Sequence, residues 1–137
     1  TETGEIKLVN AAATATTGTA VNPHSIRTQL EGGISQELGP TLFEQMVWDE
    51  GGQLINSTLM DYPLPTMETM PNYEPDFVDH AFEGGPFGAK GMGEIGSVVV
   101  PGAVLNAVYD ATGILFHEVP LLPHKVLQAI DPEAARD

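Results

Sequence analysis

Apolar residues recur every four positions from Ile26 to Leu42, which is the spacing of one face of an α-helix. Asn22 and Pro23 precede this pattern, and they are an N-cap residue and a proline suited to the first helical turn. The pattern therefore predicts a helix from Pro23 to about Glu44.

Two adjacent glycines, Gly32 and Gly33, interrupt this predicted helix. A glycine inside a helix costs about 1 kcal/mol relative to alanine. The pair therefore indicates a helix face that closely meets a backbone or a ligand, with tight helix packing as the structural explanation.

The rest of the chain predicts short elements of both kinds. Alternating apolar and polar residues predict a strand over residues 5–13, which continues into an ordered Ala/Thr tract over residues 11–20. Further extended segments are expected at 73–80 and 114–119, and a hairpin at 46–56. Helices are expected at 98–111 and 124–130. The predicted fold class is α+β, with a short mixed sheet packed with about three helices.

Composition narrows the possible partners. The 137 residues, taken as a single segment, hold 5 Lys and Arg against 19 Asp and Glu, so the formal net charge is −14. A negative charge of this size repels nucleic acid, which is therefore not expected as a partner. The acidic residues form either a solvated surface or a face that docks on a basic neighbour. The chain has no cysteine and no apolar run of about 20 residues, so we expect no thiolate chemistry, no membrane span and a cytoplasmic location.

A glycine-dense loop over residues 84–97 contains the main candidate for chemistry, Glu94. The Gly-x-Gly-x-x-Gly pattern at 91–96 follows no predicted strand, which argues against a dinucleotide site. The four histidines are scattered, so no side-chain metal site is expected. Neighbouring glycines leave room for a substrate or cofactor beside Glu94, which makes it a candidate general base; a surface or capping role is the alternative.

Six motifs follow one another along the chain: AVNP at 20–23, QLEGGISQ at 29–36, LMDYPLPT at 59–66, GPFGAKGMGE at 85–94, AVYDATG at 107–113 and LLPHKVL at 121–127. Together they resemble the molybdenum hydroxylases, the family of xanthine dehydrogenase and aldehyde oxidase. The resemblance implies the C-terminal segment of the large, molybdopterin-binding subunit, with residues 1–137 forming part of its cofactor-binding domain.

The resemblance also assigns roles to residues. Glu94 aligns with the general base that removes a proton so that a water-derived oxygen attacks an electron-poor carbon, in an N-heterocycle or an aldehyde. Gln36 aligns with a glutamine that hydrogen-bonds the molybdenum or pterin end of the cofactor. Gly91, Met92 and Gly93 are expected to offer backbone contacts beside the pterin.

The implied cofactor is molybdenum-molybdopterin, as such or as its cytosine dinucleotide. The implied partners are the remainder of the large subunit and the iron–sulfur and flavin subunits, which carry the Fe–S and FAD groups. The first residue is Thr1, and a piece of a larger protein is expected, inactive alone and prone to self-association. The alternative is a non-catalytic acidic remnant or excised domain that acts only as a folding or docking module.

Overall fold

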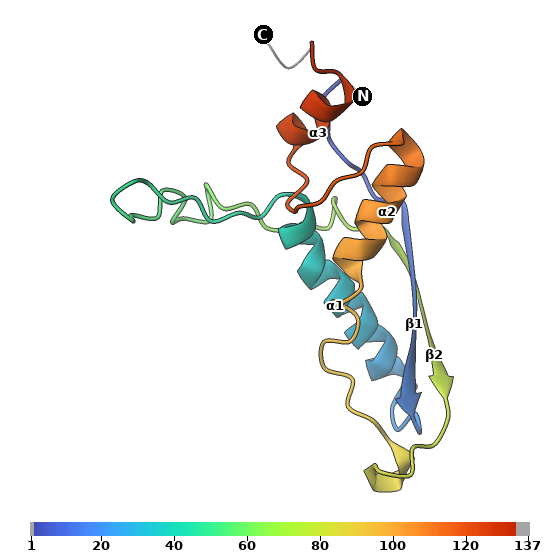
Figure 1. Cartoon of the computed structure of the whole chain (residues 1–137). Coiled ribbons are helices and arrows are strands. Elements are labelled where there is room, and N and C mark those ends of the chain that lie inside the picture. Colours follow the sequence, from blue (N-terminus) through green and yellow to red (C-terminus); the bar gives the residue numbers. More distant parts are fainter. Residues whose placement is uncertain (1, 134–137) are drawn as a thin grey trace.

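The computed structural model describes residues 2–133 of the chain. The elements in order are β1 (Asn10–Gly18), α1 (Pro23–Leu42), β2 (Asn72–Asp79), the short 3₁₀ helix η1 (Pro86–Gly88), α2 (Val100–Thr112) and α3 (Pro123–Ile130). Figure 1 shows the two strands side by side, with α1 and α2 on one face. This arrangement confirms the predicted α+β class with three helices. None of the described helices has the length and apolar character needed to span a membrane.

The sheet has two parallel strands, paired from Asn10 with Asn72 to Thr16 with Val78. A register shift follows Thr16, and an isolated antiparallel bridge then joins Gly18 to the glycine loop. Within the described residues each strand keeps one edge without a strand partner over most of its length. The bridge at Gly18 places the C-terminal end of β1 next to the loop that contains Glu94.

Helix α1 forms where the apolar spacing predicts it. The Asn22 side chain accepts a hydrogen bond from the Ser25 backbone N–H at 3.1 Å, which confirms the predicted N-cap. The helix stops at Leu42, two residues short of the predicted end. Pro40 lacks an N–H, so the helical hydrogen-bond pattern is interrupted near the end. The Gly39 carbonyl then accepts hydrogen bonds from the N–H groups of Phe43 and Glu44, the first two residues after the helix. The side chains that recur every four positions are buried: Ile26, Leu30, Ile34, Leu38 and Leu42.

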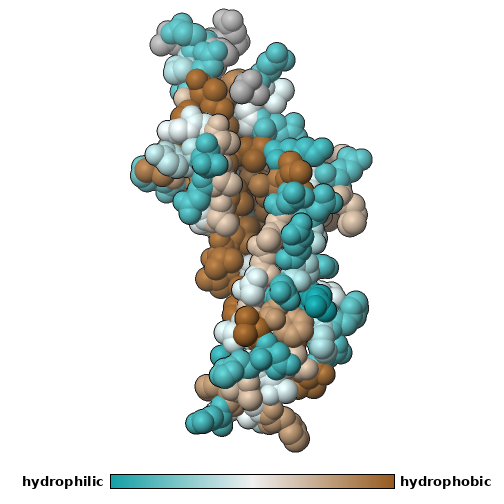
Figure 2. Space-filling view, turned by 90° about the vertical axis from the view of Figure 1, so that its right-hand side faces the viewer, coloured by the Kyte–Doolittle hydropathy of each residue, from teal (hydrophilic) through white to brown (hydrophobic). Residues whose placement is uncertain are grey.

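The core lies between α1, α2 and the sheet. Its larger cluster combines the second half of α1 with Val100, Val104 and Val108 of α2, and its smaller cluster joins the start of α1 to Ala15 of β1. A hollow of about 210 Å³ separates β1 from α2 and has walls of mostly apolar residues. Figure 2 shows an apolar stripe running down this side of the molecule.

Two predicted extended segments differ from the structure. The first strand spans Asn10–Gly18 rather than residues 5–13, because pairing with β2 selects the Ala/Thr tract, for which the composition predicts order but no strand. Residues 114–119 form no strand, because they have no neighbouring strand to pair with and instead lead to Leu121, whose N–H bonds the Thr41 carbonyl. The predicted helices at 98–111 and 124–130 and the strand at 73–80 are confirmed within two residues.

Residues 45–71, called the arm below, connect α1 to β2. The arm extends away from the body of the molecule (Figure 1), and none of its residues from 45 to 70 is buried. The predicted hairpin is present as a bridge between Trp48 and Leu54, with Gly52 at φ 78° in the turn. At the base of the arm, the Tyr62 hydroxyl donates to the Glu44 carboxylate at 2.8 Å.

This last contact predicts a pH-dependent anchor for the arm. The hydrogen bond to Glu44, together with desolvation and the carboxylate charge, raises the pKa of Tyr62 above its ordinary value of 10.0. Because the folded pKa is raised, the stabilisation is present below pH 10.0 and is lost as the pH rises through the folded pKa. Glu44→Gln should shift tyrosine ionisation, followed by ultraviolet difference titration, to lower pH. Glu50→Gln is the control, and coincident curves for Glu44→Gln and wild type would contradict the assignment.

Candidate functional site

The glycine-dense loop is fixed to the end of β1 by backbone hydrogen bonds. The Thr19 N–H donates to the Gly88 carbonyl at 2.7 Å, and the Lys90 N–H donates to the Thr17 carbonyl at 2.8 Å. Gly88 has φ 78°, a left-handed conformation that favours glycine. The loop therefore leaves the sheet in a defined direction toward α1.

Helix α1 meets this loop backbone to backbone. A Cβ built on Gly33 would lie 3.0 Å from Gly96 Cα and from Ser97 N, and a Cβ built on Gly96 would lie 2.9 Å from the Leu30 carbonyl oxygen. Real Cβ atoms essentially never approach as closely as the built Cβ at Gly96 does, so that position requires glycine. A methyl group at Gly33 would press on the loop backbone, which would have to shift by a few tenths of an ångström. The inference from sequence that the helix face meets a backbone holds at Gly33, whereas Gly32 is exposed and meets nothing within 4 Å.

Glu94 begins a tight turn whose backbone is held at two points. The Ser97 N–H and hydroxyl both donate to the Glu94 carbonyl, at 3.1 and 2.8 Å. The Gln29 side-chain amide donates to the preceding carbonyl, that of Gly93. Ser97 is buried and Gln29 belongs to α1, so the turn is fixed to the helix although its side chains face outward.

Glu94 and Gln36 meet across the chain. The Gln36 Nε2 atom donates to Glu94 Oε1 at 3.3 Å, although the two residues are 58 positions apart in sequence. Both side chains are exposed in this chain. The structure therefore brings together the two side chains that the resemblance had assigned to proton transfer and to the cofactor.

Two of the three backbone positions beside Glu94, Gly91 and Gly93, are open to one side. Gly91 and Gly93 have no positive φ, and a Cβ on either would meet no atom of this chain within 4 Å. Nothing inside the described chain therefore requires glycine at these two positions. Met92, between them, is half-buried against the small cluster that contains Ile26.

A cavity of about 350 Å³ adjoins these residues. Met92 and Gly93 line it together with hydroxyl, amide and ammonium side chains of β1, α1 and the loop: Thr17, Thr19, Asn22, Ser25, Gln29 and Lys90. Neither Glu94 nor Gln36 lines this cavity. The polar residues in its lining offer hydrogen-bond donors to an anionic or heterocyclic group that approaches the glycines.

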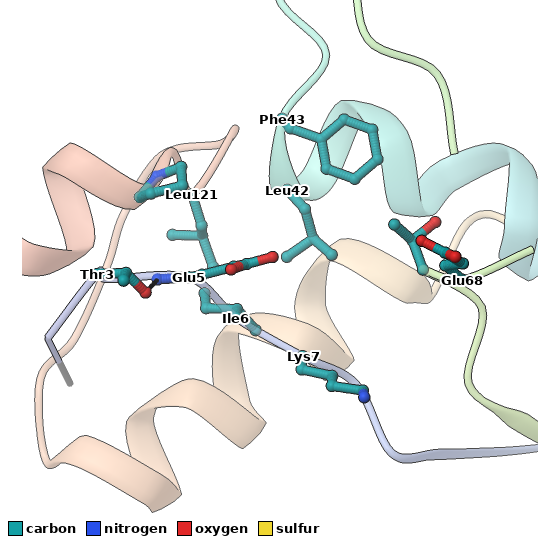
Figure 3. Close-up of a pocket in the computed structure, with 10 residues that line it drawn as sticks. Thr3, Glu5, Ile6, Lys7, Leu42, Phe43, Glu68 and Leu121 are labelled. Carbon is teal, nitrogen blue, oxygen red and sulfur yellow. Dashed lines mark hydrogen bonds between the residues drawn. The ribbon is translucent and has the colours of Figure 1, made fainter. Parts of the chain in front are cut away.

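A larger cavity, of about 710 Å³, lies at the C-terminal end of α1 and contains none of the predicted site residues. In Figure 3, Ile6, Leu42 and Leu121 lie around it, and the Glu5 side chain extends toward Leu42. Its lining combines apolar residues with polar and charged ones: Thr3, Glu5, Lys7, Glu68 and Thr69. None of these residues belongs to the predicted site, so this cavity is separate from the candidate site.

Two residues with a clear role in the geometry were not assigned one from sequence. Ser97 was not expected to close the Glu94 turn, although the spacing Glu94-x-x-Ser97 fits a four-residue turn that a polar side chain completes. The sequence places Gln29 in the motif at 29–36 but gives no sign of its hydrogen bond to the Gly93 carbonyl. Among the described residues no three His, Asp or Glu side chains are placed to hold a metal ion.

Comparison with known proteins identifies the family. Residues 1–71 match the family described as the molybdopterin cofactor-binding domain, which is more than half of the chain. The chain therefore belongs to the molybdopterin cofactor-binding domain family. The relatives include subunits named for xanthine dehydrogenase and a molybdenum-binding subunit of aldehyde oxidoreductase, which confirms the family expected from the sequence motifs.

Three relatives define the likeness. The nicotine 6-hydroxylase large subunit of Paenarthrobacter nicotinovorans is 37% identical over 130 residues, 93% of this chain and 16% of the relative. The aldehyde oxidoreductase molybdenum-binding subunit PaoC of Escherichia coli K12 is 32% identical over 93% of this chain and 18% of its own length. The crystal structure of the Cu,Mo-CO dehydrogenase has a TM-score of 0.85 and 27% identity, over 99% of this chain and 18% of that chain. The chain thus spans about one sixth of the curated relatives it matches.

The contact between α1 and the loop gives a matched pair of stability predictions. Gly33→Ala should lower the free energy of unfolding by about 1–3 kcal/mol, because the new methyl group presses on the backbone at Gly96. Gly32→Ala should raise it by about 0.5–1 kcal/mol, because the added methyl group meets open space in a helix. Urea unfolding followed by circular dichroism measures both. Equal effects of the two substitutions would show that the close approach does not matter.

Proposed function

We propose that this chain supplies the general-base glutamate and part of the pterin site of a molybdenum-dependent hydroxylase. The enzyme would oxidise an electron-poor carbon of an N-heterocycle or an aldehyde, with water as the source of oxygen. The observation that carries the proposal is the contact between Gln36 and Glu94 at 3.3 Å, which joins distant motifs into one polar pair. Relatives named as a nicotine hydroxylase and an aldehyde oxidoreductase support the substrate classes.

The residues present fit a molybdenum-molybdopterin group, in either of its forms. Gly91 and Gly93 present backbone with open space beside it, and the neighbouring cavity carries the ammonium of Lys90 and several hydroxyls. A flat, hydrogen-bonding and partly anionic group suits such a surface, because glycine lets it reach the peptide groups directly. When bound, the group supplies the two-electron redox chemistry and the site at which water is activated.

The protein's own contribution is proton transfer and positioning. The Glu94 carboxylate accepts the proton at Oε2, while Oε1 is held by the amide of Gln36. Ser97 fixes the Glu94 backbone through two hydrogen bonds to its carbonyl, so the side chain that carries the carboxylate starts from a fixed Cα position. Restricting the base in this way lowers the entropic cost of reaching the reacting group.

The proposal extends to the assembly. We place this chain at the C-terminal part of the large subunit, in the cytoplasm, with the rest of that subunit and with iron–sulfur and flavin subunits as partners. The isolated chain should be inactive, because it leaves Glu94 and Gln36 exposed to water and spans only about one sixth of the length of its relatives. The substrate-selecting side chains lie in the rest of the large subunit.

Replacing the proposed base tests the function directly. In the native assembly, Glu94→Gln should lower hydroxylation per bound molybdenum about 10²–10⁴-fold, because the amide cannot accept the proton. Molybdenum content, measured by elemental analysis, should stay at the wild-type level. Glu83→Gln removes an exposed carboxylate just before the glycine loop and should leave the rate unchanged. A Glu94→Gln assembly with full molybdenum and a near wild-type rate would disprove the role, and an assembly without molybdenum would disprove the function.

The amide that holds the base gives a second test. Gln36→Leu should lower kcat per bound molybdenum about 10-fold or more, because it removes a hydrogen bond to a charged group. Gln128→Leu, at an exposed position of α3, is the matched control. Steady-state kinetics on both variants would count against a positioning role if Gln36→Leu changes kcat less than twofold.

A further inference from the structure

The arm, residues 45–71, is ordered without having a core of its own. Its described side chains include eight large apolar ones that are exposed: Met46, Val47, Trp48, Ile55, Leu59, Met60, Leu64 and Met67. Leu59, Met60 and Met67 are the most open, at 77%, 93% and 88% exposure. Monomeric proteins rarely leave so much contiguous apolar side chain in water.

Local hydrogen bonds nevertheless give the arm a definite shape. Asp49 accepts from the N–H groups of Gly51 and Gln53 in the turn, at 2.9 and 2.8 Å. The Asn56 side chain bridges the two sides of the hairpin by accepting from the Val47 N–H at 2.9 Å and donating to the Gln45 carbonyl. A single hairpin is only marginally stable in water, so this preorganisation indicates a segment shaped to lie against another surface.

The charge of the arm limits what that surface can be. It holds four acidic residues, Asp49, Glu50, Asp61 and Glu68, and no lysine or arginine. A complementary surface therefore combines an apolar groove with a basic rim. A second copy of this chain, with a net charge of −14, is a poor match.

We propose that the arm docks into an apolar groove with a Lys/Arg rim on the remainder of the large subunit. This inference rests on the proposed function, since it assumes that such a remainder exists. The structural likeness to the CO dehydrogenase covers 99% of this chain, so it includes the arm, within a polypeptide of which this chain matches only 18%. The arm then acts as a clamp that holds the catalytic segment on the rest of the subunit.

The exposed methionines provide a probe that needs no substitution. In the native assembly, dilute hydrogen peroxide should oxidise Met60 and Met67 at least tenfold more slowly than after unfolding in denaturant, as read by peptide mass spectrometry. Oxidation in the native assembly at the unfolded rate would overturn the docking. So would an isolated chain that sizes as a dimer and shows the same protection, because the occupant would then be a second copy.

A variant pair tests the contact itself. Leu59→Asp with Met60→Asp should lower recovery of this chain in the purified assembly at least fivefold, whereas Leu59→Met with Met60→Leu keeps the apolar surface and should match wild type. Full recovery of the aspartate variant would overturn the proposal. Molybdenum analysis of the same wild-type preparation separates the two claims: metal present with unprotected methionines refutes the arm's role alone, and metal absent refutes the proposed function.

Discussion

The close approach of α1 to residues 96–97 is the constraint on which the site depends. Two glycines, Gly33 and Gly96, let the helix backbone and the loop backbone come into contact, and a Cβ at Gly96 would lie 2.9 Å from the Leu30 carbonyl oxygen. This approach brings Gln29 within reach of the Gly93 carbonyl and Gln36 within reach of Glu94. The polar pair is thus a consequence of backbone packing, and its geometry follows from residues that carry no functional group.

Sequence reasoning succeeded where local patterns decide the structure. The four-residue apolar spacing and the Asn22 cap located α1, and the apolar pattern at 98–111 located α2 within two residues. Predictions from sequence were wrong where the structure depends on which strands pair. The choice between residues 5–13 and Asn10–Gly18 depends on the partner strand, and residues 114–119 have strand character without a partner. Motif resemblance named Glu94 and Gln36, but no local pattern could give their contact or the role of Ser97.

The site consists of a buried backbone region and an exposed pair of side chains. Ser97, Gly33 and Gly96 are buried and fix the backbone, whereas Glu94 and Gln36 point into solvent. Functional groups are positioned most precisely when a packed shell holds their backbones, and this chain supplies that shell. The enclosure that would exclude water from the carboxylate is not formed by the described residues.

The parallel pairing of β1 and β2 also has a consequence for how the chain folds. Asn10 and Asn72 are 62 positions apart, and the link between the strands includes all of α1 and the whole arm. Closing such a loop costs chain entropy before any pairing energy is gained, so topologies of this kind fold slowly. Helix α1 can form early from local contacts, but Glu94 joins Gln36 only after the sheet and the glycine loop have closed. The hydrogen bond between Gln36 and Glu94 therefore depends on the completed tertiary structure, and it would report completion of the native state more faithfully than helix content does.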